Sequence, residues 1–136
     1  MMRAPHLLAG LALLLSANAA LAHHSGAMFD RSKTVEIKGT LKEVQWINPH
    51  AWIQLIGSPG GRGKAVEWSF ELGGGGAALR RMGMTRSNPK PGDKVSIKGY
   101  PLRDGRPGAS FISMTMSDGR VFAQSIPCPA GLATCK

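Results

Sequence analysis

The chain of 136 residues carries 17 basic and 8 acidic side chains, which gives a formal net charge of +9 at pH 7. This length is sufficient for one domain with a single hydrophobic core. The positive charge is spread along the sequence, and no basic stripe alternates with aromatic side chains. The composition therefore predicts weak attraction to anionic surfaces and excludes a typical nucleic-acid-binding module.

The start of the chain has the features of a signal peptide. Arg3 provides the positive start, L-L-A-G-L-A-L-L-L at residues 7–15 provides a short apolar run, and A-L-A at 20–22 fits the cleavage pattern. A bilayer-spanning helix needs roughly 20 apolar residues, which this run does not reach. We therefore expect residues 1–22 to be removed. The product would be an exported protein, periplasmic or secreted, that begins at His23 and has no transmembrane segment.

Residues 34–123 are predicted to form a small β-barrel, preceded by an N-terminal arm at residues 23–33. The first strand is long, and its apolar residues occupy odd positions up to Leu41 but even positions from Val44 onward. This change of phase requires a bulge or bend between the two positions. A long first strand that changes the face it buries is typical of a small closed barrel.

The remaining elements follow from the alternation of apolar residues and from turn residues. Further strands are predicted at residues 51–56, 66–72, 95–100 and 111–117, with a short sixth at 121–122 and a short helix at 77–82. This order predicts an all-β fold, a small five- to six-stranded OB-like barrel with one short helix between strands three and four. The predicted core contains Trp68, Phe70, Ile97, Ile112, Met114 and Met116.

Both cysteines lie near the end of the chain, within a predicted tail at residues 124–136. In an oxidising compartment, Cys128 and Cys135 are expected to pair, which gives a disulfide-closed C-terminal tail. A redox pair or a soft copper site are the alternatives. The spacing fits neither C-x-x-C nor a common metal pattern, and this favours the disulfide.

Several motifs follow one another in a specific order. They are H-H-S-G-A-M-F-D at 23–30, G-T-L-K-E-V-Q-W-I-N-P-H-A-W-I at 39–53, W-S-F-E-L-G at 68–73, L-R-R at 79–81 and K-P-G-D-K-V at 90–95. In this set the chain resembles a family of small exported bacterial proteins of unknown function, with an H-H-S-x-A-x-F-D start and an N-P-H-A-W motif. The resemblance implies an exported β-domain and no known activity.

The candidate metal ligands are His23, His24 and His50. An N-terminal histidine offers its α-amine and its imidazole to one metal ion, and the amine, with a pKa of ~7.7–8.0, loses its proton readily to copper. One further imidazole completes a nitrogen set suited to Cu(II). His50 can supply it if the arm folds back along the bent first strand. Alternatively, His24 binds through the amine, a backbone amide and its own ring.

Two other interpretations stay open. In one, the paired histidines are only a soluble start of the mature chain, His50 stabilises its turn, and the protein is a metal-free module. Such a module would bind a small molecule, an envelope polymer or an envelope protein on the face around Trp52. In the other, the histidine site serves a copper-dependent oxidative enzyme. We expect no enzyme, because Glu67 and Glu71 lie ~13 Å apart along one strand and no nucleophile with a paired base is found.

Overall fold

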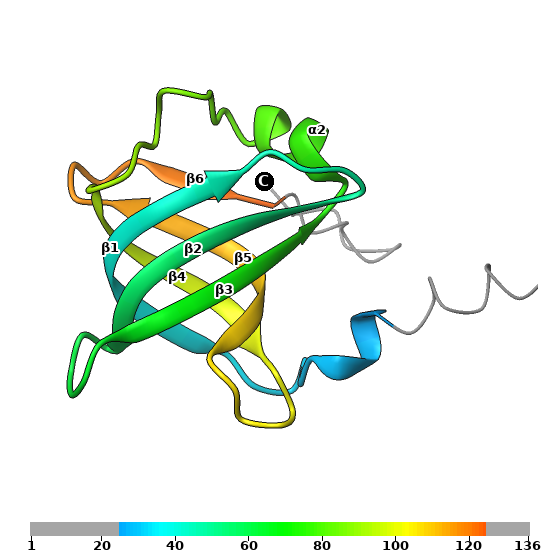
Figure 1. Ribbon diagram of the computed structural model, residues 1–136, viewed down its shortest axis with the longest axis vertical. Helices are drawn as coiled ribbons and strands as arrows, with labels where there is room; N and C mark the ends of the chain where they lie inside the picture. The colour runs from blue at the N-terminus through cyan, green and yellow to red at the C-terminus, as the bar shows by residue number, and fades with distance from the viewer. Residues whose placement is uncertain (1–24, 125–136) are drawn as a thin grey trace, which may run out of the picture.

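Six strands and two short helices make up residues 25–124, the part of the chain that the computed structural model describes (Figure 1). The strands are β1 (Val35–Gln45), β2 (His50–Pro59), β3 (Val66–Gly73), β4 (Lys94–Pro101), β5 (Gly108–Met116) and β6 (Val121–Ala123). The helices are the 3-10 helix η1 (Ser25–Met28) and α2 (Gly75–Arg81). In Figure 1, α2 covers one end of the barrel, and η1 lies near the connection between β4 and β5.

Pairing between the strands closes the sheet into a barrel. Neighbouring strands follow the order β3-β2-β1-β4-β5-β6 and pair antiparallel. A parallel pairing of β3 with β5, from Ser69 opposite Gly108 to Glu71 opposite Ser110, closes a ring of five strands. The short β6 extends β5 outside this ring. The prediction of an all-β, OB-like barrel with one short helix between strands three and four is therefore confirmed.

The predicted bulge in β1 lies at Lys42. Leu41 pairs with Leu55, but Glu43 pairs with Gln54, so Lys42 is left without a partner in the ladder with β2. Before the bulge, Ile37 and Leu41 at odd positions are buried in the core, and after it Val44 packs against the same core from an even position. The extra residue thus lets one long strand turn its apolar side inward along its whole length.

A second bulge lies in β5, and here the predicted core position Ile112 is wrong. Lys98 pairs with Ser113, whereas Gly99 pairs with Phe111, so Ile112 is the residue without a partner in β4. Phe111 is buried in its place, and Ile112 is only half-buried. Two adjacent apolar residues satisfy either phase of a strand, so alternation alone could not decide between Phe111 and Ile112.

Two strands are longer than the sequence predicts. β2 continues to Pro59, because its last residues pair with the first half of β1, with Pro59 opposite Ile37. β5 begins at Gly108, because its first residues complete the ring with β3. Glycine and proline mark turns locally, but here pairing with a neighbouring strand overrides that signal.

The core fills the inside of the barrel. Of the four predicted core residues other than methionine, it includes Trp68, Phe70 and Ile97 but not Ile112. Phe70 and Ile97 are fully buried, and Trp68 is half-buried against them, with its ring centroid 6.3 Å from that of Phe70. The indole Nε1 of Trp68 is buried without a hydrogen-bond partner among the described residues. The other fully buried side chains with large volumes are Phe111, Ile37, Leu41, Ile53, Leu55, Leu72, Leu79 and Met114.

Gly39 lies where the backbones of β1 and β2 come closest. A Cβ atom at this position would lie 2.1 Å from the carbonyl oxygen of Ile56 and 2.6 Å from the Cα atom of Gly57. We expect Gly39→Ala to lower the free energy of unfolding by about 1–3 kcal/mol, because the backbone must move to admit the methyl group. Gly73→Ala is the matched control, since its Cβ would meet open space. Urea denaturation that finds both variants equally stable would contradict the close approach.

Trp68 supplies a second test of the core. Because its indole N–H has no partner among the described residues, Trp68→Phe removes an unpaired polar group and should change the free energy of unfolding by less than about 1 kcal/mol. Trp68→Ala removes the ring from the core and should lower the free energy of unfolding by about 3 kcal/mol. The pair of variants is compared by thermal and urea unfolding. A loss from Trp68→Phe as large as that from Trp68→Ala would show that the indole nitrogen has a partner in solution.

Candidate functional site

His50 is the first residue of β2 and lies opposite Gly73, the last residue of β3. Side chains alternate along a strand, so His50, Trp52 and Gln54 point to the outside of the barrel, while Ala51 and its alternating neighbours are buried inside. The side chain of His50 is 35 % exposed. The residue is therefore attached to a rigid sheet but keeps one side of its ring open.

The nearest polar partner of His50 is the carboxylate of Glu71 on β3. The ring Nδ1 contacts Oε1 of Glu71, whose side chain is only 10 % exposed. An ionised carboxylate can only accept hydrogen bonds, so Nδ1 donates and carries the proton. In a neutral ring this leaves the lone pair on Nε2. Glu71 thus fixes both the tautomer and the direction of the ring.

This partner was not predicted from the sequence. From the sequence alone, Glu71 is a candidate only for a carboxylate pair with Glu67 along one strand. The antiparallel pairing of the second and third strands could have identified this partner. In such a pair, an outward side chain contacts not only the residue directly opposite but also the residue two positions along the neighbouring strand. His50 pairs with Gly73, and Glu71 lies two residues before Gly73 on the same face.

The loop before His50 is held by the glycines that begin α2. The side-chain Oδ1 of Asn48 accepts a hydrogen bond from the backbone N–H of Gly76 at 3.2 Å. Gly75 has a positive φ of 55°, and a Cβ there would lie 2.1 Å from the same Asn48 oxygen. The asparagine of the N-P-H-A-W motif and the glycine run therefore fit against one another, and this contact fixes the turn that leads into β2.

The N-terminal arm lies against the connection between β4 and β5. Phe29 forms a β-bridge with Leu102, and the backbone N–H of Asp30 donates to the carbonyl of Pro101 at 2.8 Å. The side chain of Asp30 accepts a hydrogen bond from the hydroxyl of Ser32, which lowers the pKa of this carboxyl. The arm is thus anchored to the barrel by contacts of residues 27–30, including the hydrogen bonds that the backbone N–H and Nε of Arg103 donate to the carbonyls of Met28 and Ala27.

A pocket of about 430 Å³ lies between this arm and the outer face of the sheet. Met28 and Phe29 line it from the arm, and Trp52 and Glu71 line it from β2 and β3. The carboxylate that holds His50 is therefore also part of a pocket wall. Met28 and Phe29 of the arm thus share a pocket with Trp52 of β2, the strand that begins at His50.

Two other charged residues in the pocket wall are occupied by partners. Both carboxylate oxygens of Glu67 lie 2.8 Å from Nζ of Lys42, and this hydrogen-bonded ion pair raises the pKa of the lysine. Nε of Arg106 donates to Oδ2 of Asp104 at 2.7 Å. Both pairs are exposed to solvent, so they add little to stability, but they neutralise the charges that they contain.

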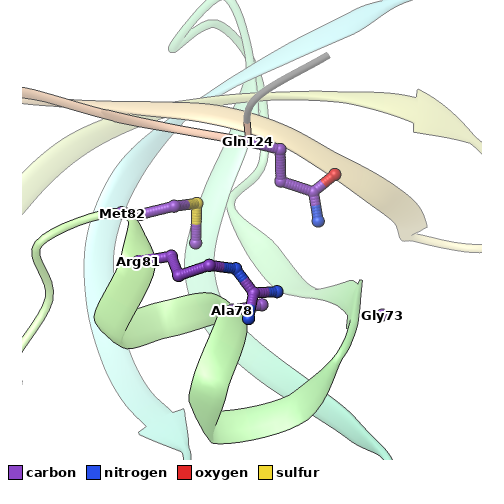
Figure 2. A pocket seen from close by; sticks show the side chains of 5 residues that line it. All are labelled: Gly73, Ala78, Arg81, Met82 and Gln124. Carbon is purple, nitrogen blue, oxygen red and sulfur yellow. The ribbon is translucent and has the colours of Figure 1, made fainter. Parts of the chain in front are cut away.

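A second pocket of about 220 Å³ lies at the end of the barrel that α2 covers. Figure 2 shows the side chains of Arg81, Met82 and Gln124 around it, with Ala78 on α2 and Gly73 at the end of β3. Among the described residues that line it are one cation and one amide and neither a histidine nor a carboxylate. It therefore has no part in the candidate histidine site.

Four of the predicted site residues lie outside the described residues. These are His23, His24, Cys128 and Cys135. Within residues 25–124, no group of three or more histidine, cysteine, aspartate or glutamate side chains converges as a metal site. The metal site and the disulfide therefore both stay predictions, and of their residues the structure places only His50.

The fold and the site together define a small OB-like barrel that carries an oriented surface histidine beside a pocket. The sequence matches the model described as Family of unknown function (DUF6152) over residues 11–111, and the chain belongs to this family. No curated protein and no solved structure matches it. In the described part of the chain, no helix is both long enough and apolar enough to cross a membrane. The predicted membership of a family of unknown function is confirmed, and export stays a prediction.

The contact between Asn48 and α2 can be tested without any ligand. Asn48→Ala removes the acceptor for the Gly76 N–H and should lower the free energy of unfolding by about 1 kcal/mol. The Gly76 amide should then exchange its hydrogen faster in NMR measurements. Asn48→Asp is the control, because it keeps an oxygen at the same place and should protect the amide. Unchanged exchange in Asn48→Ala would mean that this contact does not hold the loop.

Proposed function

We propose that this protein is an exported, non-enzymatic copper-binding domain of the periplasm or the secreted fraction. Its Cu(II) would be held by the α-amine and imidazole of His23 and by the imidazole of His50, with His24 next to them. The observation that carries the proposal is the contact between Nδ1 of His50 and the buried carboxylate of Glu71. Histidines that bind metals commonly donate their second ring N–H to a carboxylate, which directs the free nitrogen toward the metal.

The position of the arm supports the same site. Met28 lies in the pocket wall that also contains Glu71. His23 is five positions before Met28, and residues 25–28 form the 3-10 helix η1, which rises only roughly 2 Å per residue. The predicted mature N-terminus is therefore close in sequence to the part of the arm that lines this pocket, as a ligand set shared with His50 requires. Nitrogen ligands of this kind favour Cu(II) over the other divalent first-row metals.

A metal-free binding module is the second candidate function. It is favoured by the pocket of about 430 Å³ beside Trp52, whose size is typical of a small-molecule site. In this case the contact between His50 and Glu71 would serve to fix the pocket wall. The two candidates predict different losses in the same variants, so they can be separated.

The copper proposal predicts that correctly processed protein binds about one Cu(II) per chain, with the spectrum of tetragonal, nitrogen-rich coordination. Affinity should fall as the pH drops through the imidazole pKa of ~6.5, because protons compete for the same nitrogens. His50→Ala should weaken binding by at least about 10-fold, since it removes one ligand. Glu71→Gln should weaken it by roughly 10-fold, the usual effect of losing a carboxylate behind a ligand. Competition titration and electron paramagnetic resonance measure both effects.

The N-terminus provides the control for this prediction. A variant with one added glycine before His23 moves the α-amine away from the imidazole and should lose most of its affinity. If His50→Ala binds Cu(II) as tightly as the native protein, the site is local to His23 and His24 and the shared site is wrong. If native protein and the glycine variant bind equally weakly, copper binding itself is wrong and the second candidate takes its place.

A further inference from the structure

The pocket between the arm and the sheet has a composition that selects one class of ligand. We infer that it binds a small organic ammonium ion, whose nonpolar part packs on Trp52 and Phe29 and whose cationic group meets Glu71. The inference rests on the second candidate function and does not require copper. It follows from the nonpolar wall, from the state of each charge in that wall, and from the size of the pocket.

The larger part of the wall is nonpolar. Phe29 and Met28 come from the arm, Trp52 comes from β2, and Leu102 and Pro107 come from the connection between β4 and β5. A site enclosed by three separate segments can surround a ligand and remove it from water, which is typical of small-molecule pockets. Aromatic faces also attract cations through their quadrupole, and tryptophan does so most strongly.

The charges in the wall leave one carboxylate for a ligand. Glu67 is neutralised by Lys42, and Arg106 by Asp104. Glu71 differs, because it is buried and only its Oε1 has a hydrogen-bond partner among the described residues. Its second oxygen can accept a hydrogen bond from a ligand. A donor with a positive charge forms the strongest hydrogen bond to a carboxylate.

Other ligand classes fit this wall less well. An anion would place its charge beside the Glu71 carboxylate, and like charges at short distance repel strongly in a partly buried site. A neutral nonpolar molecule would remove water from the free oxygen of Glu71 without replacing its hydrogen bond, which carries an energetic cost. An ammonium ion with a nonpolar group avoids both costs. A pocket of about 430 Å³ admits a molecule with one ring and a short amine.

The test compares two probes of nearly equal shape, benzylammonium and benzyl alcohol, on the mature protein in the presence of a chelator. Binding is followed by NMR through the indole N–H signal of Trp52. We expect benzylammonium to bind about 10-fold more tightly than the alcohol, the factor that corresponds to one charge-assisted hydrogen bond or cation–π contact. Trp52→Leu and Glu71→Gln should each weaken benzylammonium by a similar factor.

Two variants separate this site from the copper site. The variant with one added glycine before His23 should lose Cu(II) but keep benzylammonium, because it leaves His50, Trp52 and Glu71 unchanged. Trp52→Leu should lose benzylammonium but keep Cu(II), which also verifies that this variant is folded. If benzyl alcohol binds as tightly as benzylammonium, the pocket takes ligands but the ammonium class is wrong. If neither probe binds, or if benzoate binds better, the inference is overturned, and in the first case the metal-free module fails with it.

Discussion

Closure of the barrel by the parallel pairing of β3 with β5 is the constraint on which the other features depend. A closed ring of five strands requires the sheet to curve, and β-bulges supply a local bend and extra twist in two of its strands. Lys42 in β1 and Ile112 in β5 are the extra residues that restore the match between backbone pairing and buried face. The same closure pairs the start of β5 with the edge of β3 and places the connection before β5 beside the outward side chains of β3. The pocket at Glu71 therefore exists because the ring is closed at that place.

The histidine site depends on a second, local contact. His50 follows a turn whose asparagine receives the Gly76 N–H, and Gly75 has the conformation and the absence of a side chain that this approach needs. The turn is therefore fixed relative to α2, and α2 is anchored in the core by Leu79. A binding side chain that begins a strand and follows a fixed turn loses little conformational freedom when it binds its partner. A single histidine in this position would therefore bind more tightly than one on a free loop.

The sequence predicts those parts of the structure in which the alternation of apolar and polar residues along one strand is unambiguous. The odd-to-even change in β1 was visible because glycine, lysine and glutamate separate its apolar residues. The change in β5 was not, because Phe111 and Ile112 are adjacent and each could face the core. The partner of His50 could not be identified from composition either, since it depends on the register between two strands. Once His50 is opposite Gly73, however, Glu71 is the only acidic residue that the outer face of β3 can place beside it among the described residues.

Glu71 belongs to both candidate sites, and this links them energetically. A metal ion on Nε2 of His50 withdraws electron density from the ring and strengthens the hydrogen bond from Nδ1 to the carboxylate. An ammonium ion at the second oxygen of Glu71 draws on the same negative charge and weakens that hydrogen bond. If both ligands bind one molecule, each must therefore lower the affinity of the other, and by the same factor, because coupling between two binding equilibria is reciprocal. The shared carboxylate would make the two proposed ligands compete for one charge, although they would contact different atoms of the site.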